Sequence, residues 1–468
     1  MTPLVRSYTL AFGLSLVGSL SLGVLALFSI FTQPLQSRLR YPQSTINSII
    51  IAQTLGLNGF TPLCGLLADL KGPWILSLLA LACYLLGFSS VLFIYENEVL
   101  DPVPVYISFF LIGCAHTCLL FSCLLNCARS LGKYYTTLAI GTPNLMIAFS
   151  TFLEIHMLQN WFDESDPTKA FQHKLRFFMI TLCASSIFAF LGCKITDRTE
   201  KNEHETEHFS SFNASPLLSG GSAVLGSHSP KAAIATEDLE YVQLDDQMSA
   251  SSVSYKHKIS RFLRDPLMYP LNMAFFMAVG ATEFFLTNLS SILSSLDQNT
   301  LDYNLQLYSI TSTAIRFVIM VATDHVCAKY GISRLSILAS LIVMCGLGHV
   351  YLSSWPIAGL HINVIVMLNA VLNSGLYTLF PAVLAAVYGF DILGTTYGIF
   401  SCCSIIGNML LNLVYGVDYT RNCVNSTDSN LVICSTYTFL LSGVVLTVLG
   451  SLIYCLKNRY LARAHENF

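Results

Sequence analysis

Charged residues are scarce in this sequence. Asp, Glu, Lys and Arg make up 11% of its 468 residues, whereas a soluble globular protein carries roughly 25%. Hydrophobic residues make up 54%, and the formal net charge is only −3. So small a charge argues against nucleic acid as a partner. The composition indicates an integral membrane protein.

Several signatures of chemistry are missing as well. The sequence has no phosphate-binding glycine loop, no cluster with metal-ligand spacing and no paired carboxylates within its apolar runs. Neither an enzyme nor a metal or cofactor is therefore indicated. No cleavage signature follows the first apolar run, which predicts a retained membrane span. Most of the fifteen cysteines lie within apolar runs and are expected to be buried small hydrophobes.

Long apolar runs, by contrast, are abundant. A helix needs about 20 predominantly apolar residues to cross a bilayer, and these runs lack the alternation of barrel strands. Twelve runs meet this requirement: 8–32, 44–67, 73–95, 104–127, 134–158, 176–193, 267–293, 303–323, 334–355, 361–388, 394–416 and 432–456. They predict an all-α integral membrane fold with twelve transmembrane helices in two bundles of six.

A polar stretch separates the two sets of six runs. Residues 194–265 hold 11 acidic and 8 basic residues and no apolar run able to span a membrane. We expect a hydrophilic, largely disordered connector here. The predicted organisation is a six-helix bundle over 1–193, this connector, a second bundle over 266–456 and a tail over 457–468.

The distribution of lysine and arginine predicts the orientation. If both termini and the connector are cytosolic, that side carries 17 of the 24 basic residues, as the positive-inside rule requires. The loop after the eleventh span then faces the lumen or the exterior. That loop contains a glycosylation sequon at Asn425 and two cysteines, Cys423 and Cys434, that are candidates for a disulfide.

The turn between the second and third spans reads "GLLADLKG". Gly65 and Gly72 allow a tight turn and close helix approach, and Asp69 can accept hydrogen bonds from the start of a neighbouring helix or pair with a base. A plain polar loop is the alternative. The stretch resembles the loop signature of the major facilitator superfamily, although Pro73 and Trp74 replace the basic residues that usually follow the last glycine.

Further motifs narrow this resemblance. Span eight, "STAIRFVIMVATD", is similar to monocarboxylate transporters and nodulin-like proteins in placing Arg316 eight residues before Asp324, with Ser312 where the former usually have aspartate. Taken whole, the chain resembles fungal transporters named as monocarboxylate permease homologues. The resemblance implies a vacuolar membrane, with the plasma membrane as the alternative, and roles for Asp69 and Asp324 in conformational switching and for Arg316 in meeting the solute.

Polar residues within apolar spans are the candidate solute and coupling sites. Arg316 can bind a substrate carboxylate, or bond helix carbonyls in a purely structural role. Glu283 and Glu154 are candidate proton carriers, because a carboxylate removed from water favours its neutral form. Counting about 1.5 Å per residue from Asp324 and from the start of span seven separates Arg316 from Glu283 by about 12 Å in depth, so we expect no static pair. Glu154 is expected near water.

Amides and small residues complete the candidate list. Pro143 and Asn144 are expected to break the regularity of the fifth span and free carbonyls for a cavity. Asn288 is a further candidate in span seven. In span ten one helix face carries a polar stripe that either lines the route or joins helices: Asn369, Asn373 and Tyr377. Gly394 and Gly398 in span eleven are expected to serve packing.

These features predict a secondary transporter that moves a small polar solute, with a monocarboxylate or other organic anion as the candidate solute and protons as a candidate co-substrate. The alternatives are a membrane sensor on the same fold and a transporter of a solute without a carboxylate. Two connector segments resemble signals read by sorting adaptors, namely Leu217-Leu218 and residues 241–244, "YVQL". Besides the bilayer, such adaptors are the partners that the sequence suggests.

Overall fold

The computed structural model of this protein describes residues 3–27, 29–41, 43–131, 135–161, 166–213, 255–295, 300–354, 361–419, 421 and 436–466. These residues form helices and no strands. Eleven stretches among them are helical, long and apolar enough to cross a membrane. The predicted fifth span corresponds to a further helix of 26 residues. The all-α membrane fold is therefore confirmed.

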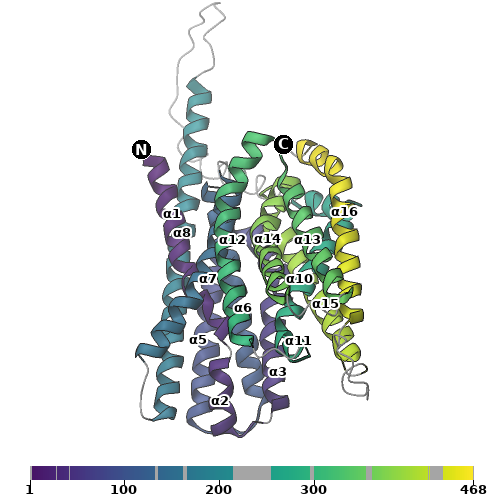
Figure 1. The fold of residues 1–468 in the computed structure, drawn as a ribbon. Coiled ribbons are helices and arrows are strands. Elements are labelled where there is room, and N and C mark those ends of the chain that lie inside the picture. Colours follow the sequence, from purple (N-terminus) through teal and green to yellow (C-terminus); the bar gives the residue numbers. More distant parts are fainter. Residues whose placement is uncertain are drawn as a thin grey trace, which may run out of the picture.

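The helices run side by side along one axis, and both ends of the chain lie at the same end of the bundle (Figure 1). We call this end the terminal end. The first half of the chain forms α1 (Pro3–Ser19), η1 (Leu22–Leu27), α2 (Ser29–Leu39), α3 (Gln43–Thr54), η2 (Leu55–Gly59), α4 (Thr61–Lys71), α5 (Trp74–Glu96), α6 (Val103–Leu131), α7 (Thr136–Trp161) and α8 (Pro167–Asn213). The second half forms α10 (Met268–Thr287), α11 (Leu289–Ser295), α12 (Leu301–Tyr330), α13 (Arg334–Ser354), α14 (Ile362–Tyr388), α15 (Leu393–Tyr419) and α16 (Thr436–Glu466).

Each half packs mainly upon itself. In the first half α5 packs on α6 and α8, and α1 packs on α8; in the second half α13 packs on α16, and α12 on α14. The halves meet where α4 lies against α15, and where α7 lies against α12 and α14. The structure thus brings together five spans, the second, fifth, eighth, tenth and eleventh, that carry most of the predicted functional residues.

Four spans differ from those predicted in their continuity or their ends. The first two spans are interrupted, by a 3-10 segment at η1 and a π-helical segment at η2, whereas α7 continues through Pro143. The predicted break at Pro143 is therefore wrong. Span seven is divided at Asn288, which ends α10. Helix α12 ends at Gly331 with a left-handed φ of 66°, so Asp324 lies inside the helix rather than at its end.

The start of the predicted connector is helical. Helix α8 continues to Asn213 and projects beyond the bundle at the terminal end (Figure 1). Residues 255–264 are helical as well. Lys194 to Asn213 therefore extend the sixth span instead of opening a structureless connector. Residues 214–254, with both sorting segments, lie outside the described residues, as do Asn425, Cys423 and Cys434. The other thirteen cysteines are free thiols.

Candidate functional site

Arg316 lies at the contact between the two halves and bonds to both of them. Its Nη1 donates to the carbonyl of Asn144 on α7 at 3.2 Å, and its Nη2 donates to Oδ1 of Asn373 on α14 at 3.0 Å. Its Nε is buried and has no hydrogen-bond partner. The guanidinium is held by neutral acceptors only, so its charge is positioned but not neutralised by them.

Tyr377 connects this arginine to a carboxylate. The guanidinium carbon of Arg316 lies 5.9 Å from the Tyr377 ring centroid, and the Tyr377 hydroxyl donates to Oε1 of Glu283 at 3.4 Å. Asn144 also contacts Tyr377, because its Nδ2 donates to the Tyr377 carbonyl at 2.8 Å. Five predicted residues therefore form one cluster, the central cluster: Asn144, Glu283, Arg316, Asn373 and Tyr377.

The depth estimate that separated Arg316 from Glu283 was wrong. It placed the end of the eighth span at Asp324, but α12 runs on to Tyr330. Fourteen residues from Arg316 to Tyr330 correspond to about 21 Å, and fifteen residues from Met268 to Glu283 to about 22 Å. The two groups are therefore at similar depth. Both are described residues, and they make no direct ion pair, because Tyr377 links them instead.

Two of the predicted asparagines, Asn288 and Asn369, lie outside the central cluster. Asn288 donates through Nδ2 to Oδ1 of Asn412 on α15 at 2.7 Å, which joins two helices of the second half. Oδ1 of Asn369 lies 3.2 Å from Nε2 of His349, again within that half. The polar stripe of the tenth span thus divides: Asn373 and Tyr377 belong to the central cluster, and Asn369 joins helices.

A second inter-half contact surrounds Asp69. Its Oδ1 accepts from the N–H of Gly394 at 3.0 Å, and its Oδ2 accepts from the N–H of Thr395 at 2.6 Å. These are the second and third residues of α15, whose N–H groups have no partner within their own helix. Of the two bonding modes predicted for Asp69, the structure shows contact with a neighbouring helix start.

Small residues allow α4 and α15 to approach this closely. A Cβ at Gly65 would lie 2.0 Å from the Gly394 carbonyl oxygen, and a Cβ at Gly398 would lie 2.5 Å from the Thr61 carbonyl oxygen. Thr61 Oγ1 also donates to the Gly398 carbonyl at 2.8 Å. The packing role expected for Gly394 and Gly398 is therefore confirmed, and the contact joins the halves. Nearby, Gly72 ends α4 with a φ of 88° that favours glycine.

Asp324 makes the corresponding contact with the other half. Its Oδ2 accepts from the N–H of Thr137 at 3.0 Å and of Leu138 at 3.3 Å, the second and third residues of α7. Arg334 adds an ion pair at 2.9 Å to Oδ1 of Asp324, and its Nε donates to Thr137 Oγ1 at 3.0 Å. The two aspartates therefore bind equivalent helix starts in opposite halves.

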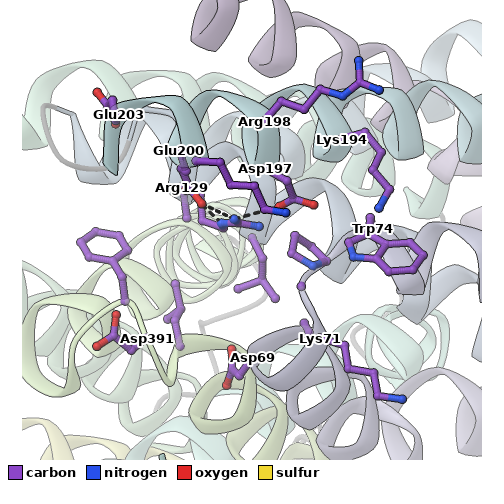
Figure 2. A pocket seen from close by; sticks show the side chains of 18 residues that line it. Asp69, Lys71, Trp74, Arg129, Lys194, Asp197, Arg198, Glu200, Glu203 and Asp391 are labelled. Atoms are coloured by element: carbon purple, nitrogen blue, oxygen red, sulfur yellow. Dashed lines mark hydrogen bonds and ion pairs between the residues drawn. The ribbon is translucent and has the colours of Figure 1, made fainter. Parts of the chain in front are cut away.

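A cavity of about 1140 Å³ opens beside Asp69 at the terminal end. Figure 2 shows Arg129 of α6 within it, bonded to Asp197 and Glu200 of α8. The amino group of Lys194 lies 3.5 Å from the Trp74 ring centroid. These contacts fix the extension of α8 on the first half. The sequence analysis did not single out Arg129 or Arg334. The one signal that could have identified them was a basic residue at the end or start of a span.

Known proteins with similar sequences are named as transporters. No family model matches the chain. A protein named "Probable transporter MCH1" from Wickerhamomyces anomalus is 25% identical over 432 residues, which cover 92% of this chain and 83% of that protein. A protein of the same name from Saccharomyces cerevisiae is 24% identical over 449 residues, covering 90% and 86%.

Solved structures establish the fold. The proton:xylose symporter XylE bound to 6-bromo-6-deoxy-D-glucose has a TM-score of 0.64 at 12% sequence identity, with 96% of each chain covered. The major facilitator transporter FucP in an outward conformation has a TM-score of 0.59 at 14% identity, covering 96% of this chain and 99% of that one. The chain has the fold of these major facilitator transporters, and its relatives are named as transporters rather than enzymes, which supports a secondary transporter of a small solute. Within that class, the chain is similar along most of its length to the fungal transporters named above.

Proposed function

We propose that this transporter moves a small organic anion, such as a monocarboxylate, at the central cluster. The observation that carries the proposal is the bonding of Arg316. Its two terminal nitrogens are held by neutral oxygens from both halves, and its buried Nε has no partner. An arginine side chain matches the planar, two-oxygen geometry of a carboxylate. A bound anion would supply the charge that the neutral acceptors lack.

The contact of Arg316 with both halves supports alternating access. Asn144 belongs to α7 in the first half, and Asn373 belongs to α14 in the second. A solute bound at Arg316 would therefore lie where one half moves against the other, the usual place for a transporter site. Protons are the proposed co-substrate, because an anion carried with a proton crosses the membrane without net charge.

Reconstitution tests this function. The purified protein in liposomes is offered labelled lactate, pyruvate, an amino acid and a neutral sugar, each with and without an inward proton gradient. We expect saturable uptake of a monocarboxylate that the gradient accelerates. Uptake of the sugar alone would contradict an anion site, and absence of all flux would favour a sensor.

Asp69 and Asp324 hold the halves together at the terminal end, which we assign to the cytosol because the basic residues are concentrated there. Each carboxylate accepts two main-chain N–H groups of the opposite half. Negative charge at a helix start contributes about 0.3–1 kcal/mol, and up to about 2 kcal/mol when partly buried. These contacts form and break as the halves move, so we assign Gly65, Asp69, Gly72 and Asp324 to conformational switching.

Asp69→Asn is expected to reduce turnover about tenfold while changing solute affinity less than about twofold. The amide keeps one acceptor oxygen but presents an amino group to a helix N–H, so the closed arrangement becomes less stable. Maximal exchange rate and half-saturating lactate concentration in liposomes measure the two effects. Glu98→Gln is the control, since the Glu98 side chain is 61% exposed and pairs with Arg38 away from the start of α15. A larger change in affinity than in turnover would contradict the switching role.

We further propose that the protein lies in the vacuolar membrane, with the plasma membrane as the alternative, and that Asn425 lies on the face away from the cytosol.

Asn425→Gln is expected to abolish any mass shift produced by a glycosidase that removes N-linked glycans. The measurement is gel mobility of the membrane-extracted protein before and after the enzyme. An unchanged shift in the variant would assign the glycan to another site and remove this support for the orientation.

A further inference from the structure

Glu154 is a buried carboxylate outside the central cluster. Its side chain is 5% exposed, although its sequence position near the end of a span suggested contact with water. Oε1 accepts a hydrogen bond from Ser150, which is fully buried, at 3.2 Å. Oε2 has no hydrogen-bond partner. A carboxylate with one neutral donor and one unpartnered oxygen is poorly placed to remain charged.

The partner of Glu154 also contacts the interruption in the first membrane span. Ser150 Oγ accepts the N–H of Gly23 at 3.0 Å, and Gly23 lies in η1, where the chain leaves α-helical geometry. A second hydroxyl contact holds the same region, because Ser185 on α8 donates to Ser21 at 2.8 Å. A single hydroxyl therefore joins Glu154 to the break in the first span.

Glu154 and Glu283 differ in their surroundings. Glu283 accepts from Tyr377 and lies in the same cluster as the cation Arg316. Glu154 makes no ion pair with any described residue. A proton bound at Glu154 is therefore not held in competition with a neighbouring cation.

Among the described side chains, none that faces Glu154 supplies a charge. Arg316 and Tyr377 contact α7 at Asn144, ten residues or about 15 Å along the helix from Glu154. Residues 22–27 of η1 are all uncharged. Tyr84 on α5 interacts with Glu154, and its phenol is neutral at physiological pH. The Tyr84 hydroxyl is itself buried without a partner.

We propose that Glu154 is the residue at which the first half binds and releases the transported proton, at its unpartnered Oε2. The proposal rests on the proposed function as a proton-coupled carrier. The proton is taken from water on one face and returned to water on the other, and no other bond is made or broken. Glu283 belongs instead to the central cluster, which we propose as the solute site.

Infrared spectroscopy tests the protonation without any solute. The purified full-length protein in lipid is titrated with alkali while the C=O stretching band of protonated carboxyl groups is recorded. We expect a band that persists at neutral pH in the unmodified protein and in Glu283→Gln, and that is clearly weaker in Glu154→Gln. Glutamine keeps the shape of the side chain but cannot ionise. An undiminished band in Glu154→Gln would overturn the proposal.

Transport in liposomes tests the coupling. With labelled lactate as the probe, Glu154→Gln is expected to lose about tenfold or more of its proton-driven net uptake while one-for-one lactate exchange falls less than about twofold. Equal loss of both activities would indicate a structural role and overturn the proposal. If the unmodified protein moves no lactate, the proposed function fails in its monocarboxylate form, and the infrared result still decides the role of Glu154.

Discussion

Arg316→Ala is expected to lower monocarboxylate uptake about 100-fold, with normal membrane insertion. The substitution removes the one cation of the central cluster, and hydrogen bonds to a charged group contribute roughly 1.5–3 kcal/mol each. Loss of two such bonds to a bound carboxylate costs at least about 3 kcal/mol, which is at least about two powers of ten in affinity, because one power of ten corresponds to about 1.4 kcal/mol. The measurement is initial uptake of labelled lactate and pyruvate into liposomes, with elution of the detergent-solubilised protein as the check on folding.

Two further variants sharpen this result. Arg316→Lys keeps the charge but loses the planar pair of donors, so uptake is expected to lie between that of alanine and that of the unmodified protein. Arg176→Ala is the matched control, because Arg176 is 50% exposed and pairs with Glu96 at the surface, where an ion pair contributes little. Retained uptake in Arg316→Ala would exclude the arginine from the solute site.

Gly65→Ala is expected to prevent the halves from closing at the terminal end. The added Cβ would lie 2.0 Å from the Gly394 carbonyl oxygen, whereas carbon contacts are favourable at about 3.5–4.0 Å. Because the obstacle is main chain, it cannot turn aside as a side chain does. We expect α4 and α15 to separate and transport to fall at least about tenfold.

Hydrogen exchange at the start of α15 measures this separation directly. The N–H groups of Gly394 and Thr395 are bonded to Asp69 in the closed arrangement and should exchange faster in the variant. Gly59→Ala is the control in the same span, because a Cβ at Gly59 meets nothing within 4 Å. Unchanged exchange with unchanged transport in Gly65→Ala would show that the halves do not need this contact.

The sequence was most informative about features that depend on local composition. Apolar runs separated by polar turns predict membrane helices because the bilayer demands continuous apolar segments, and most of the predicted spans match observed helices. "GLLADLKG" revealed Gly65 and Asp69 because a small residue and a charge at the membrane edge are unusual. The partner of Asp69 could not be predicted, since it lies 325 residues away along the chain.

The central cluster shows where this kind of inference loses accuracy. Polar residues in apolar spans identified Arg316, Glu283 and Tyr377 because burying them is costly without a purpose. Their arrangement depended on helix ends, and an end placed at Asp324 instead of Tyr330 made two neighbours appear far apart. Asn288 and Asn369 have the same chemistry as Asn373 but face other helices of their own half, a distinction that only packing reveals.

At the terminal end, the contacts that Asp69 and Asp324 make across the halves are with main-chain N–H groups. Asp69 and Asp324 each bind the second and third N–H groups of a helix, and every residue except proline supplies such a group. The side chains of Thr137, Leu138 and Thr395 can therefore change without loss of these hydrogen bonds, as long as proline is avoided. Gly394 cannot, because a Cβ there would lie 2.5 Å from Asp69 Oδ1. Residues that line the solute route have no such freedom. The switching contacts that we propose for Asp69 and Asp324 would thus be kept while the residues that line the proposed solute site change to suit another solute.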